Sequence, residues 1–313
     1  MTEQAATTQT GVVPRQGAET ADAAELGRQR VVRSPWQQIV RRFLRHRLAM
    51  IGLTIFLVIA LMAVAAPLVA QHGPNDTDLR ARNLGPSADH WFGTDRTGRD
   101  TFARVVYAGR VSLSVGVVAV LISVGIGMIL GALAGYFGGL ADSLIMRFTD
   151  VIMTFPPIVI ILTLAAIAGP GVGKTMLIIG LLNWPVPCRL VRAKFLTLRE
   201  QEFVLAARAI GAPTGRIIAR HAFPNVVDVL IVNASLGIAV AILLEAGISF
   251  LGAGVQAPTP SWGNMLNVAR NVSVLEGQPW LWMPAGAAIV LTVLAVNFIG
   301  DGLRDAFDPR MKV

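Results

Sequence analysis

Long apolar runs alternate with shorter polar segments along most of the chain. Six runs stand out, at about 48–70, 111–134, 151–168, 175–190, 226–250 and 282–300. Each approaches the roughly 20 residues that a helix needs to cross a bilayer, although the fourth is short and contains Pro185 and Pro187. Lipid offers the backbone no hydrogen-bond partners, so such runs cross as helices. The pattern predicts an all-α, multi-pass membrane protein with a six-span domain over residues 48–311.

The stretch before the first run is polar and then basic. Residues 1–27 lack an apolar period, which predicts a disordered tail. Residues 28–47 contain seven arginines and no acidic residue, and Ser34-Pro35 is a favourable helix start. The apolar residues that follow have helical spacing: Trp36, Ile39, Val40, Phe43 and Leu44. We therefore expect a basic amphipathic helix over 28–47 in the membrane interface, with a solvated basic segment as the alternative.

Composition and charge agree with a membrane protein. Of the 313 residues, 54% are hydrophobic and 15% charged, and the mean hydropathy is +0.60, whereas about 25% of a soluble domain is charged. The net charge of +8 raises the possibility of nucleic-acid binding. However, the basic residues flank apolar runs and form no stripe with aromatic side chains, so no nucleic-acid partner is expected. The only cysteine, Cys188, excludes an intrachain disulfide, and the four histidines show no metal-ligand spacing.

The distribution of lysine and arginine predicts the orientation in the membrane. Six spans place both termini on the same side. With that side cytoplasmic, the inner segments 1–47, 135–150, 189–225 and 301–313 hold 19 of the 27 basic residues. The positive-inside rule therefore favours cytoplasmic N and C termini in the cell membrane. Residues 71–110 form a long outer loop in which acidic residues accompany the basic ones.

One octet suggests nucleotide chemistry. Residues 168–175, AGPGVGKT, fit the looser form of the phosphate-binding loop, with Lys174 in the lysine position. A working loop of this kind follows a buried strand and opens a helix, whereas this octet lies between two apolar runs. We expect a tight turn between two spans, with Lys174 at the membrane surface. A membrane-embedded nucleotide-hydrolysing enzyme is an alternative that rests on this octet alone, and no other catalytic arrangement is apparent, so the chain is not expected to be an enzyme.

The polar segment 189–225 has the strongest functional pattern. A helix is predicted from Thr197 to Ile210, Gly211 interrupts it, and a second helix runs from Pro213 to about Ala222. The result is a bent pair of short helices between two spans. Ala206 and Ala207 are small enough to let a partner surface approach the backbone, and three arginines could pair with acidic groups of that partner: Arg208, Arg216 and Arg220. An ordinary amphipathic surface loop is the alternative.

This segment resembles the EAA motif of permeases from binding-protein-dependent ABC importers. Ala206, Ala207, Gly211 and Pro224 match the motif at its spacing. Three positions depart from it, with Leu205, His221 and Phe223 in place of Glu, Ile and Leu. Glu202 or Glu200, one turn earlier, could replace the missing carboxylate. Residues 90–116, 245–266 and 297–310 resemble signatures of the dipeptide, oligopeptide and nickel branch, and the likeness covers about residues 35–311.

The resemblance implies the transmembrane domain of a type I ABC importer. Its partners would be a second homologous permease subunit, two ATPase subunits that bind the ATP, and an extracytoplasmic solute-binding protein, so the chain itself would need no cofactor. The residues that would contact the ATPases are Glu202, Ala206, Ala207, Arg208, Gly211, Arg216 and Pro224. The alternative is an ion-gradient-driven secondary transporter, which would usually need more spans and paired carboxylates within the membrane.

Polar and small residues within the spans are further candidates. Glu245 and Asn233 could contact the translocation path, and an interhelical hydrogen bond is the alternative for each. Asn183 and Asn297 are expected to hydrogen-bond between helices. Glycines at four-residue spacing, 127, 131 and 135, predict a close helix contact. Three tryptophans are expected to form an outer interfacial belt: Trp262, Trp280 and Trp282.

Overall fold

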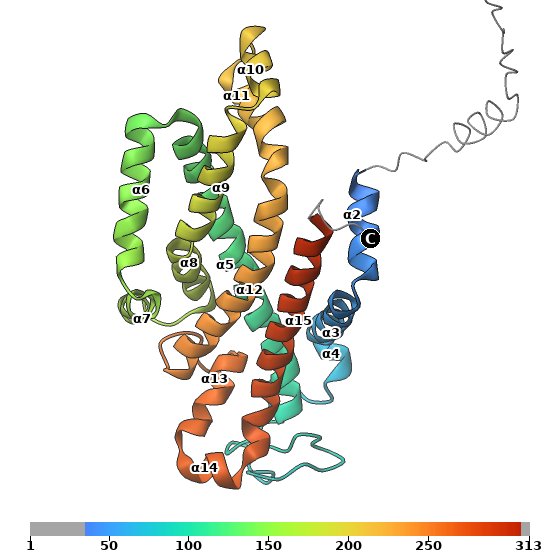
Figure 1. Ribbon diagram of the computed structural model, residues 1–313. Helices are drawn as coiled ribbons and strands as arrows, with labels where there is room; N and C mark the ends of the chain where they lie inside the picture. Colours follow the sequence, from blue (N-terminus) through green and yellow to red (C-terminus); the bar gives the residue numbers. More distant parts are fainter. Residues whose placement is uncertain (1–34, 308–313) are drawn as a thin grey trace, which may run out of the picture.

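The computed structural model describes residues 35–307, and the molecule in that range is a long bundle of helices (Figure 1). The predicted tail 1–27, residues 28–34 and the end of the predicted domain at 308–311 lie outside the described residues. In the described part the only β-type pairing is an isolated bridge between Thr94 and Asp100. The prediction of an all-α protein is confirmed.

Five of the helical stretches in residues 35–307 are long and apolar enough to cross a membrane. They are α3 (Arg47–Val64), α5 (Thr101–Phe137), α8 with α9 (Val172–Leu182 and Pro185–Leu198), α12 (Val227–Phe250) and α15 (Met283–Phe307). A sixth span exists if α6 (Gly139–Thr154) and α7 (Pro157–Ala168) count together, although they meet at 85°. The structure therefore supports five or six spans at the predicted places.

The third predicted span needs correction, because it is not one straight helix. Residues 151–168 comprise the end of α6 and all of α7, with the break at Phe155 and Pro156. Phe155 has an extended backbone (φ −92°, ψ 142°), as expected of a residue before proline. Pro156 and Pro157 then start α7 in a new direction. The predicted inner loop 135–150 is also mostly helix, since α6 covers 139–154 and runs beside α9 (Figure 1).

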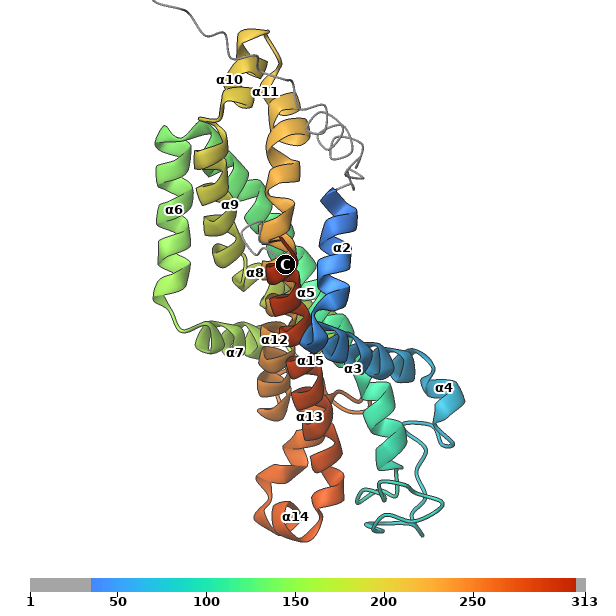
Figure 2. The same ribbon diagram turned by 45° about the vertical axis from the view of Figure 1, so that its right-hand side comes forward.

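The central element is α5, which extends well past the predicted span 111–134. It starts where the Asp100 carboxylate accepts a hydrogen bond from the Ala103 N–H at 2.7 Å, a standard N-cap. Its 37 residues correspond to about 55 Å of helix, longer than the roughly 30 Å hydrocarbon core of a bilayer. In two views α5 runs diagonally through the bundle (Figures 1 and 2).

The predicted glycine seam is where α5 and α9 pack. A Cβ at Gly131 would lie 2.5 Å from the carbonyl oxygen of Cys188, and one at Gly135 would lie 2.6 Å from the Cβ of Phe195. A Cβ at Gly127 would lie 2.8 Å from the backbone nitrogen of Cys188 in α9. Gly125, in contrast, faces open space. The prediction of close packing along 127, 131 and 135 is confirmed, and it brings the two backbones into direct contact.

The basic helix predicted before the first span is present as α2 (Pro35–Arg45). It lies alongside the C-terminal part of α15 (Figure 2), where the rings of Trp36 and Phe307 meet edge to face at 6.3 Å. Trp36, Val40 and Leu44 remain more than half exposed, so an apolar strip is left uncovered. A place in the membrane interface stays a prediction.

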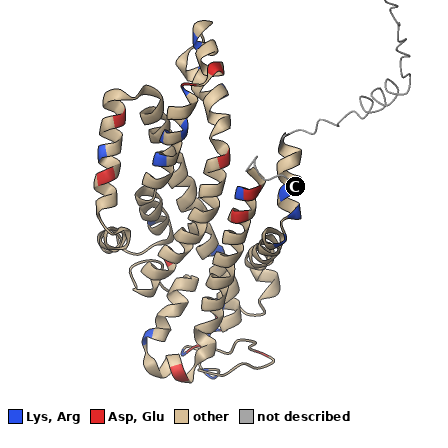
Figure 3. Ribbon diagram, viewed as in Figure 1, with Lys and Arg blue, Asp and Glu red and all other residues tan. Residues whose placement is uncertain are grey.

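The two ends of the bundle differ in structure. One end carries the short helices α10 (Glu202–Ala209) and α11 (Thr214–Arg216). The other end carries the irregular segment 70–100, together with α4 (Ala66–Val69), α13 (Trp262–Leu266) and α14 (Val272–Gly277). Charged residues gather toward both ends and are sparse over the middle of the bundle (Figure 3), which is the distribution expected of a protein that crosses lipid.

Candidate functional site: the bent segment between α9 and α12

The segment that joins α9 to α12 projects beyond the neighbouring helices at one end of the molecule (Figure 1). Its elements are α10, α11, a π-helical turn η1 (Ile217–Ala222) and a 3-10 turn η2 (Phe223–Asn225). The single helix predicted from Thr197 to Ile210 is wrong, because α9 ends at Leu198 and α10 starts at Glu202. Between them Gln201 is extended, with ψ 144°. The break reorients the chain so that α10 packs against η1, a tertiary contact that helix propensity alone does not encode.

Gly211 ends α10 in a Schellman turn. The Ala212 N–H donates to the Ala207 carbonyl at 3.0 Å and the Gly211 N–H donates to the Arg208 carbonyl at 2.9 Å, which is the hydrogen-bond pattern of that motif. Gly211 has a φ of +78°, a conformation in which a Cβ costs free energy. No atom lies within 4 Å of the position where a Cβ would be. Backbone conformation, not space, therefore requires glycine here.

The inner face of α10 is anchored to the bundle. Val204, Ala207 and Ile217 form a small buried cluster, against which Tyr136 of α5 packs. The guanidinium of Arg208 lies 5.1 Å from the centre of the Tyr136 ring, a cation–π distance. Arg208 therefore already contacts this chain, although the residue remains exposed. Ala207, one of the two predicted small residues, packs inside this cluster, and a contact of Ala207 with a partner stays a prediction.

Several apolar residues of α10 and its C-cap are exposed. Phe203 is 43% exposed, Leu205 49% and Ile210 85%, and Ala206 is exposed as well. Glu202 is the first residue of α10 and is also exposed. Soluble surfaces rarely leave three large apolar side chains exposed within so short a segment, and such exposure marks an interaction site. The arrangement is suited to docking another protein.

The second short helix ends before Pro224, as predicted. It consists of α11 and the π-turn η1, which ends at Ala222, and the 3-10 turn η2 then leads into α12. Proline lacks an N–H and its ring clashes with the carbonyl four residues earlier, so an α-helix cannot continue unchanged past Pro224. The ring of His221 lies 6.5 Å from that of Phe203. Contacts therefore connect α10 to η1, η1 to η2 and η2 to the start of α12. Arg216 is exposed at the end of α11.

Ion pairs tie the helices beneath this segment together. Arg192 of α9 forms a two-pronged pair with Asp142 of α6, in which Nη2 lies 2.6 Å from Oδ2. Arg189 contacts Asp150 at 2.6 Å in the same pair of helices. Bidentate geometry gives directional strength that a single contact lacks. These contacts hold α6 against α9 near the end that carries α10.

Glu245 is buried and makes an interhelical hydrogen bond, while its contact with the translocation path stays a prediction. The side chain has no exposed surface. Its Oε2 accepts from the Ser112 hydroxyl at 2.9 Å and its Oε1 accepts from the Ser249 hydroxyl at 2.8 Å. The Ser112 oxygen accepts in turn from the Trp262 N–H. The network joins α12, α5 and α13.

Trp262 is only 1% exposed, so its predicted place in an interfacial belt is wrong.

The other polar residues of the spans are less informative. Asn183 does not bridge helices, since its side-chain NH2 donates to the Ile179 carbonyl of its own helix at 2.7 Å. Asn233 and Asn297 are half-buried on α12 and α15, and a contact of Asn233 with the translocation path stays a prediction.

A hollow of about 1080 Å3 opens at the end opposite α10. Its lining includes four arginines: Arg96, Arg99, Arg104 and Arg270.

The phosphate-loop octet is a helix–turn–helix corner. Ala168 ends α7 and Val172 starts α8, with Gly169 and Gly171 at positive φ between them. The Lys174 ammonium folds back and donates to the Ala168 carbonyl at 2.5 Å. Here Lys174 neutralises the C-terminal end of a helix, and a helix, not a strand, precedes the loop. The predicted turn between two apolar helices is confirmed.

One cluster at the opposite end escaped the sequence analysis. His72, His90 and Asp100 each place a potential ligand atom within 4.8 Å of the others. They are separated by 18 and 10 residues along an irregular segment, so no spacing rule brings them together. The only available signal was that Asp100 precedes a helix that starts at Thr101, which predicts an N-cap and not a histidine partner.

Two protein-family models match this chain and define the class of protein to which it belongs. Residues 127–313 match the family model described as binding-protein-dependent transport system inner membrane component. Residues 34–86 match the N-terminal transmembrane domain of oligopeptide transport permease C. The helical bundle with its bent segment is therefore the transmembrane domain of a permease.

Named relatives cover almost the whole chain. A Brucella suis protein described as a peptide permease is 50% identical over 279 residues, which are 89% of this chain and 92% of that protein. The dipeptide transport system permease protein DppC of Bacillus subtilis is 43% identical over 277 residues, 88% and 86% of the two chains. The glutathione transport system permease protein GsiD of Pectobacterium atrosepticum is 41% identical over 286 residues, 91% and 94% of the two chains.

The chain belongs to the family of inner-membrane components of binding-protein-dependent transport systems. It is a multi-pass permease subunit of an ABC importer with a type I transmembrane domain. The family is a membrane-permease component and not an enzyme. The alternative of an ion-gradient-driven secondary transporter has no support among these relatives.

Proposed function

We propose that this chain is one half of the translocation pathway of a peptide importer and that the segment 199–225 docks an ATPase subunit. The exposed apolar residues of α10 and its C-cap carry the proposal. Burial of a large apolar side chain contributes about 1.5–3 kcal/mol, and Phe203, Leu205 and Ile210 are exposed on α10 and at its C-cap. The Schellman turn at Gly211 and the contact between Arg208 and Tyr136 hold α10 in one orientation, which lowers the entropic cost of docking.

The proposed complex contains two permease subunits, two ATPase subunits and a solute-binding protein. In it the end that carries α10 faces the cytoplasm, in keeping with the basic residues of the inner segments. ATP binds to the ATPase subunits, and this chain needs no cofactor of its own. The contact of Lys174 agrees with this assignment of ATP to the partner subunits, because its ammonium donates a hydrogen bond to the Ala168 carbonyl at the end of α7.

We infer that the substrates are peptides from the names of the relatives, which include a dipeptide and a glutathione permease. The charge of the hollow at the end opposite α10 is consistent with a solute that carries a negative group. Arg96 and Arg270 are exposed at it, while Asp95 on the same lining pairs with Arg99 at 2.7 Å. An excess of positive charge attracts the carboxylate that every free peptide carries. ATP-driven closure of the ATPases would move α10 and, through η1, the start of α12.

The test is reconstitution of the full complex in lipid vesicles, with uptake of a labelled dipeptide and of a labelled pentapeptide. Ile210→Glu should abolish co-purification of the ATPase subunits and uptake, because it places a charge on the docking face. Val272→Glu is the matched control, since Val272 is an exposed apolar residue (63%) at the opposite end. Lys174→Ala should leave ATP binding by the complex unchanged. Retention of the ATPases by Ile210→Glu would contradict the docking surface, and uptake of neither peptide would contradict the substrate.

A further inference from the structure

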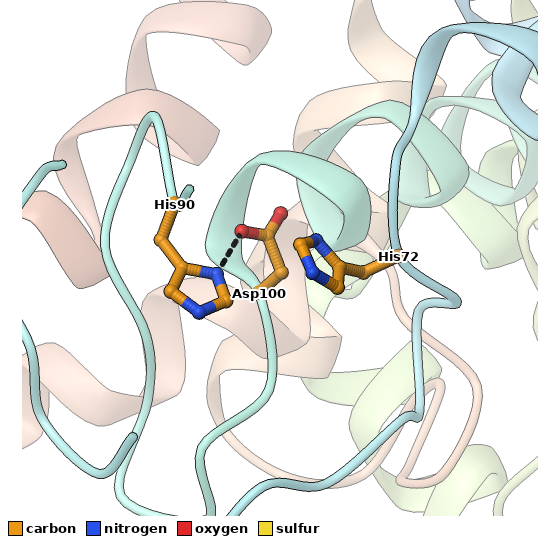
Figure 4. Close-up of side chains that lie close together, drawn as sticks. All are labelled: His72, His90 and Asp100. Carbon is orange, nitrogen blue, oxygen red and sulfur yellow. Dashed lines mark hydrogen bonds and ion pairs between the residues drawn. The ribbon is translucent and has the colours of Figure 1, made fainter. Parts of the chain in front are cut away.

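The end of the molecule opposite α10 contains a group of metal-ligating side chains for which peptide transport provides no role. His72 follows α4, His90 lies in a turn of the irregular segment, and Asp100 is the N-cap of α5. Figure 4 shows the two histidines on opposite sides of the Asp100 carboxylate, each from a different stretch of chain. Their rings are 4.9 Å apart between centres. Three stretches of chain therefore converge on a single point.

The distances suit one ion. His90 Nδ1 lies 2.9 Å from Asp100 Oδ2, close to the roughly 3.3 Å that separates two ligands on a tetrahedral zinc ion with bonds of about 2.0–2.1 Å. The potential ligand atoms of all three side chains lie within 4.8 Å of one another. His72 is only partly buried, and a torsion change that moves its ring inward by about 1.5 Å brings it into ligating range.

The surroundings favour a bound ion as well. A hollow of about 10 Å3, lined by His72, Asp89 and Asp100 among others, is near the least volume that holds one water molecule. The exposed Asp89 adds a second carboxylate at its rim. The Asp100 carboxylate has one oxygen available for the ion. Its Oδ1 accepts the helix-capping N–H of Ala103, whereas its Oδ2 faces His90. Phe102 lines the same hollow and packs on Trp91 with ring centres 4.8 Å apart, which shields one side from water.

We propose that His72, His90 and Asp100 form a binding site for one divalent transition-metal ion of the zinc class. Two imidazole nitrogens and one carboxylate oxygen are ligands that Zn2+ favours, whereas Ca2+ and Mg2+ require an all-oxygen set. The fourth position is filled by water or by Asp89. The ion fastens the segment between residues 72 and 90 to the first turn of α5. This site is independent of the peptide proposal, so either can fail while the other holds.

The test measures zinc on the full-length chain in lipid nanodiscs, purified through a tag without histidine. After treatment with EDTA and gel filtration, the protein is titrated with Zn2+ against a chromophoric chelator, and bound metal is counted by mass spectrometry. We expect one ion per chain. His72→Ala and His90→Ala should each weaken binding by at least 100-fold, since loss of a group that merely orients a ligand already costs 10–100-fold.

Two further variants separate ligation from folding. Asp100→Asn retains an N-cap side chain but removes the negative charge, and it should weaken Zn2+ binding by at least 10-fold while α5 stays folded. His46→Ala and His221→Ala remove the remaining two histidines of the chain and should bind zinc as the wild type does. X-ray absorption should show two imidazole ligands at about 2.0–2.1 Å.

The outcomes discriminate clearly. Binding of Zn2+ by the wild type no tighter than by the double variant His72→Ala/His90→Ala overturns the proposal. Zinc binding that is lost in His46→Ala or His221→Ala also overturns it. If His90→Ala proves unstable, His72→Ala decides alone, because the described contact of the His72 side chain is with the His90 ring and its loss leaves the cap of α5 intact.

Discussion

Substitution of Gly211 tests whether the Schellman turn sets the docking geometry of α10. At a φ of +78°, a non-glycine residue costs about 1–2 kcal/mol. The open space around the missing Cβ means that no steric clash adds to this cost. Gly211→Ala should therefore lose about 1–2 kcal/mol and Gly211→Val more, because β-branched residues tolerate this region least. Gly211→Asn should lose least, since asparagine often adopts this conformation.

The cost should appear in docking, not in insertion of the chain. The free protein can relieve the strain by opening the last turn of α10, which reduces the fraction that is ready to bind. The apparent Kd for the ATPase subunit then rises in proportion. A loss of 1–2 kcal/mol corresponds to about 5- to 30-fold weaker binding. The assay is binding of labelled ATPase subunit to the permease in nanodiscs, with ATP-driven uptake as the functional readout.

Gly215 provides the matched control. It is an exposed glycine four residues further on, also with no atom within 4 Å of a Cβ, but in the helical turn α11 and without a positive φ. Gly215→Ala should bind ATPase as well as the wild type or slightly better, because alanine favours a helix by about 0.5–1 kcal/mol. The reasoning is refuted if Gly211→Val binds within twofold of the wild type, or if Gly215→Ala is impaired as much as Gly211→Ala.

Three further predictions concern packing and charge. Gly131→Ala should lower the melting temperature in detergent, because the new Cβ would lie 2.5 Å from a carbonyl oxygen of α9 and overpacking costs about 1–3 kcal/mol. Gly125→Ala is the control, since its Cβ faces open space, and it should raise the melting temperature. Equal shifts for both variants would contradict the close packing at Gly131. Glu245→Ala leaves two buried serine hydroxyls without their acceptor, and should cost at least about 2 kcal/mol, whereas an unchanged melting temperature would show that the network contributes nothing. Burial raises the pKa of Asp95, but hydrogen bonds from Thr97 and Arg99 outweigh it and hold the pKa below its usual 3.8. The stability that the Asp95 carboxylate contributes is thus present above about pH 4 and lost as the pH falls through the lowered pKa. Proteolysis of this loop should therefore accelerate more steeply below pH 4 in the wild type than in Asp95→Asn, and equal acceleration would contradict the role of Asp95.

Hydrophobic periodicity predicted the spans well because lipid permits few alternatives. The runs 226–250 and 282–300 correspond to α12 and α15, and the glycines at four-residue spacing identified the contact of α5 with α9. The same rule also limited the prediction. It treated 151–168 as one span, although Pro156 and Pro157 turn the chain there by 85°. It also started the second span at 111, after the first turns of α5, which begins at Thr101.

Features that depend on tertiary contact could not be predicted. The break between Leu198 and Glu202 contains neither glycine nor proline, and it forms because Val204 and Ala207 pack on Ile217. Gly211 was predicted as the bend because a single glycine has a local backbone preference. Burial of Trp262 and convergence of His72 on Asp100 require knowledge of which distant segments meet, which no local pattern in this chain contains.

The length of α5 has a mechanical consequence. Its first turn is held by the Asp100 cap, and its last turn carries Tyr136, on which Arg208 of α10 rests. A rigid rod of about 55 Å that tilts by only 5° about its middle displaces each end by about 2.4 Å in opposite directions. Because the glycine seam leaves no room for α9 to slide independently, such a tilt carries α9 with it. A displacement of α10 by a docked partner is therefore expected to reach the opposite end of the bundle as a lever movement, without any change in the internal structure of the helix.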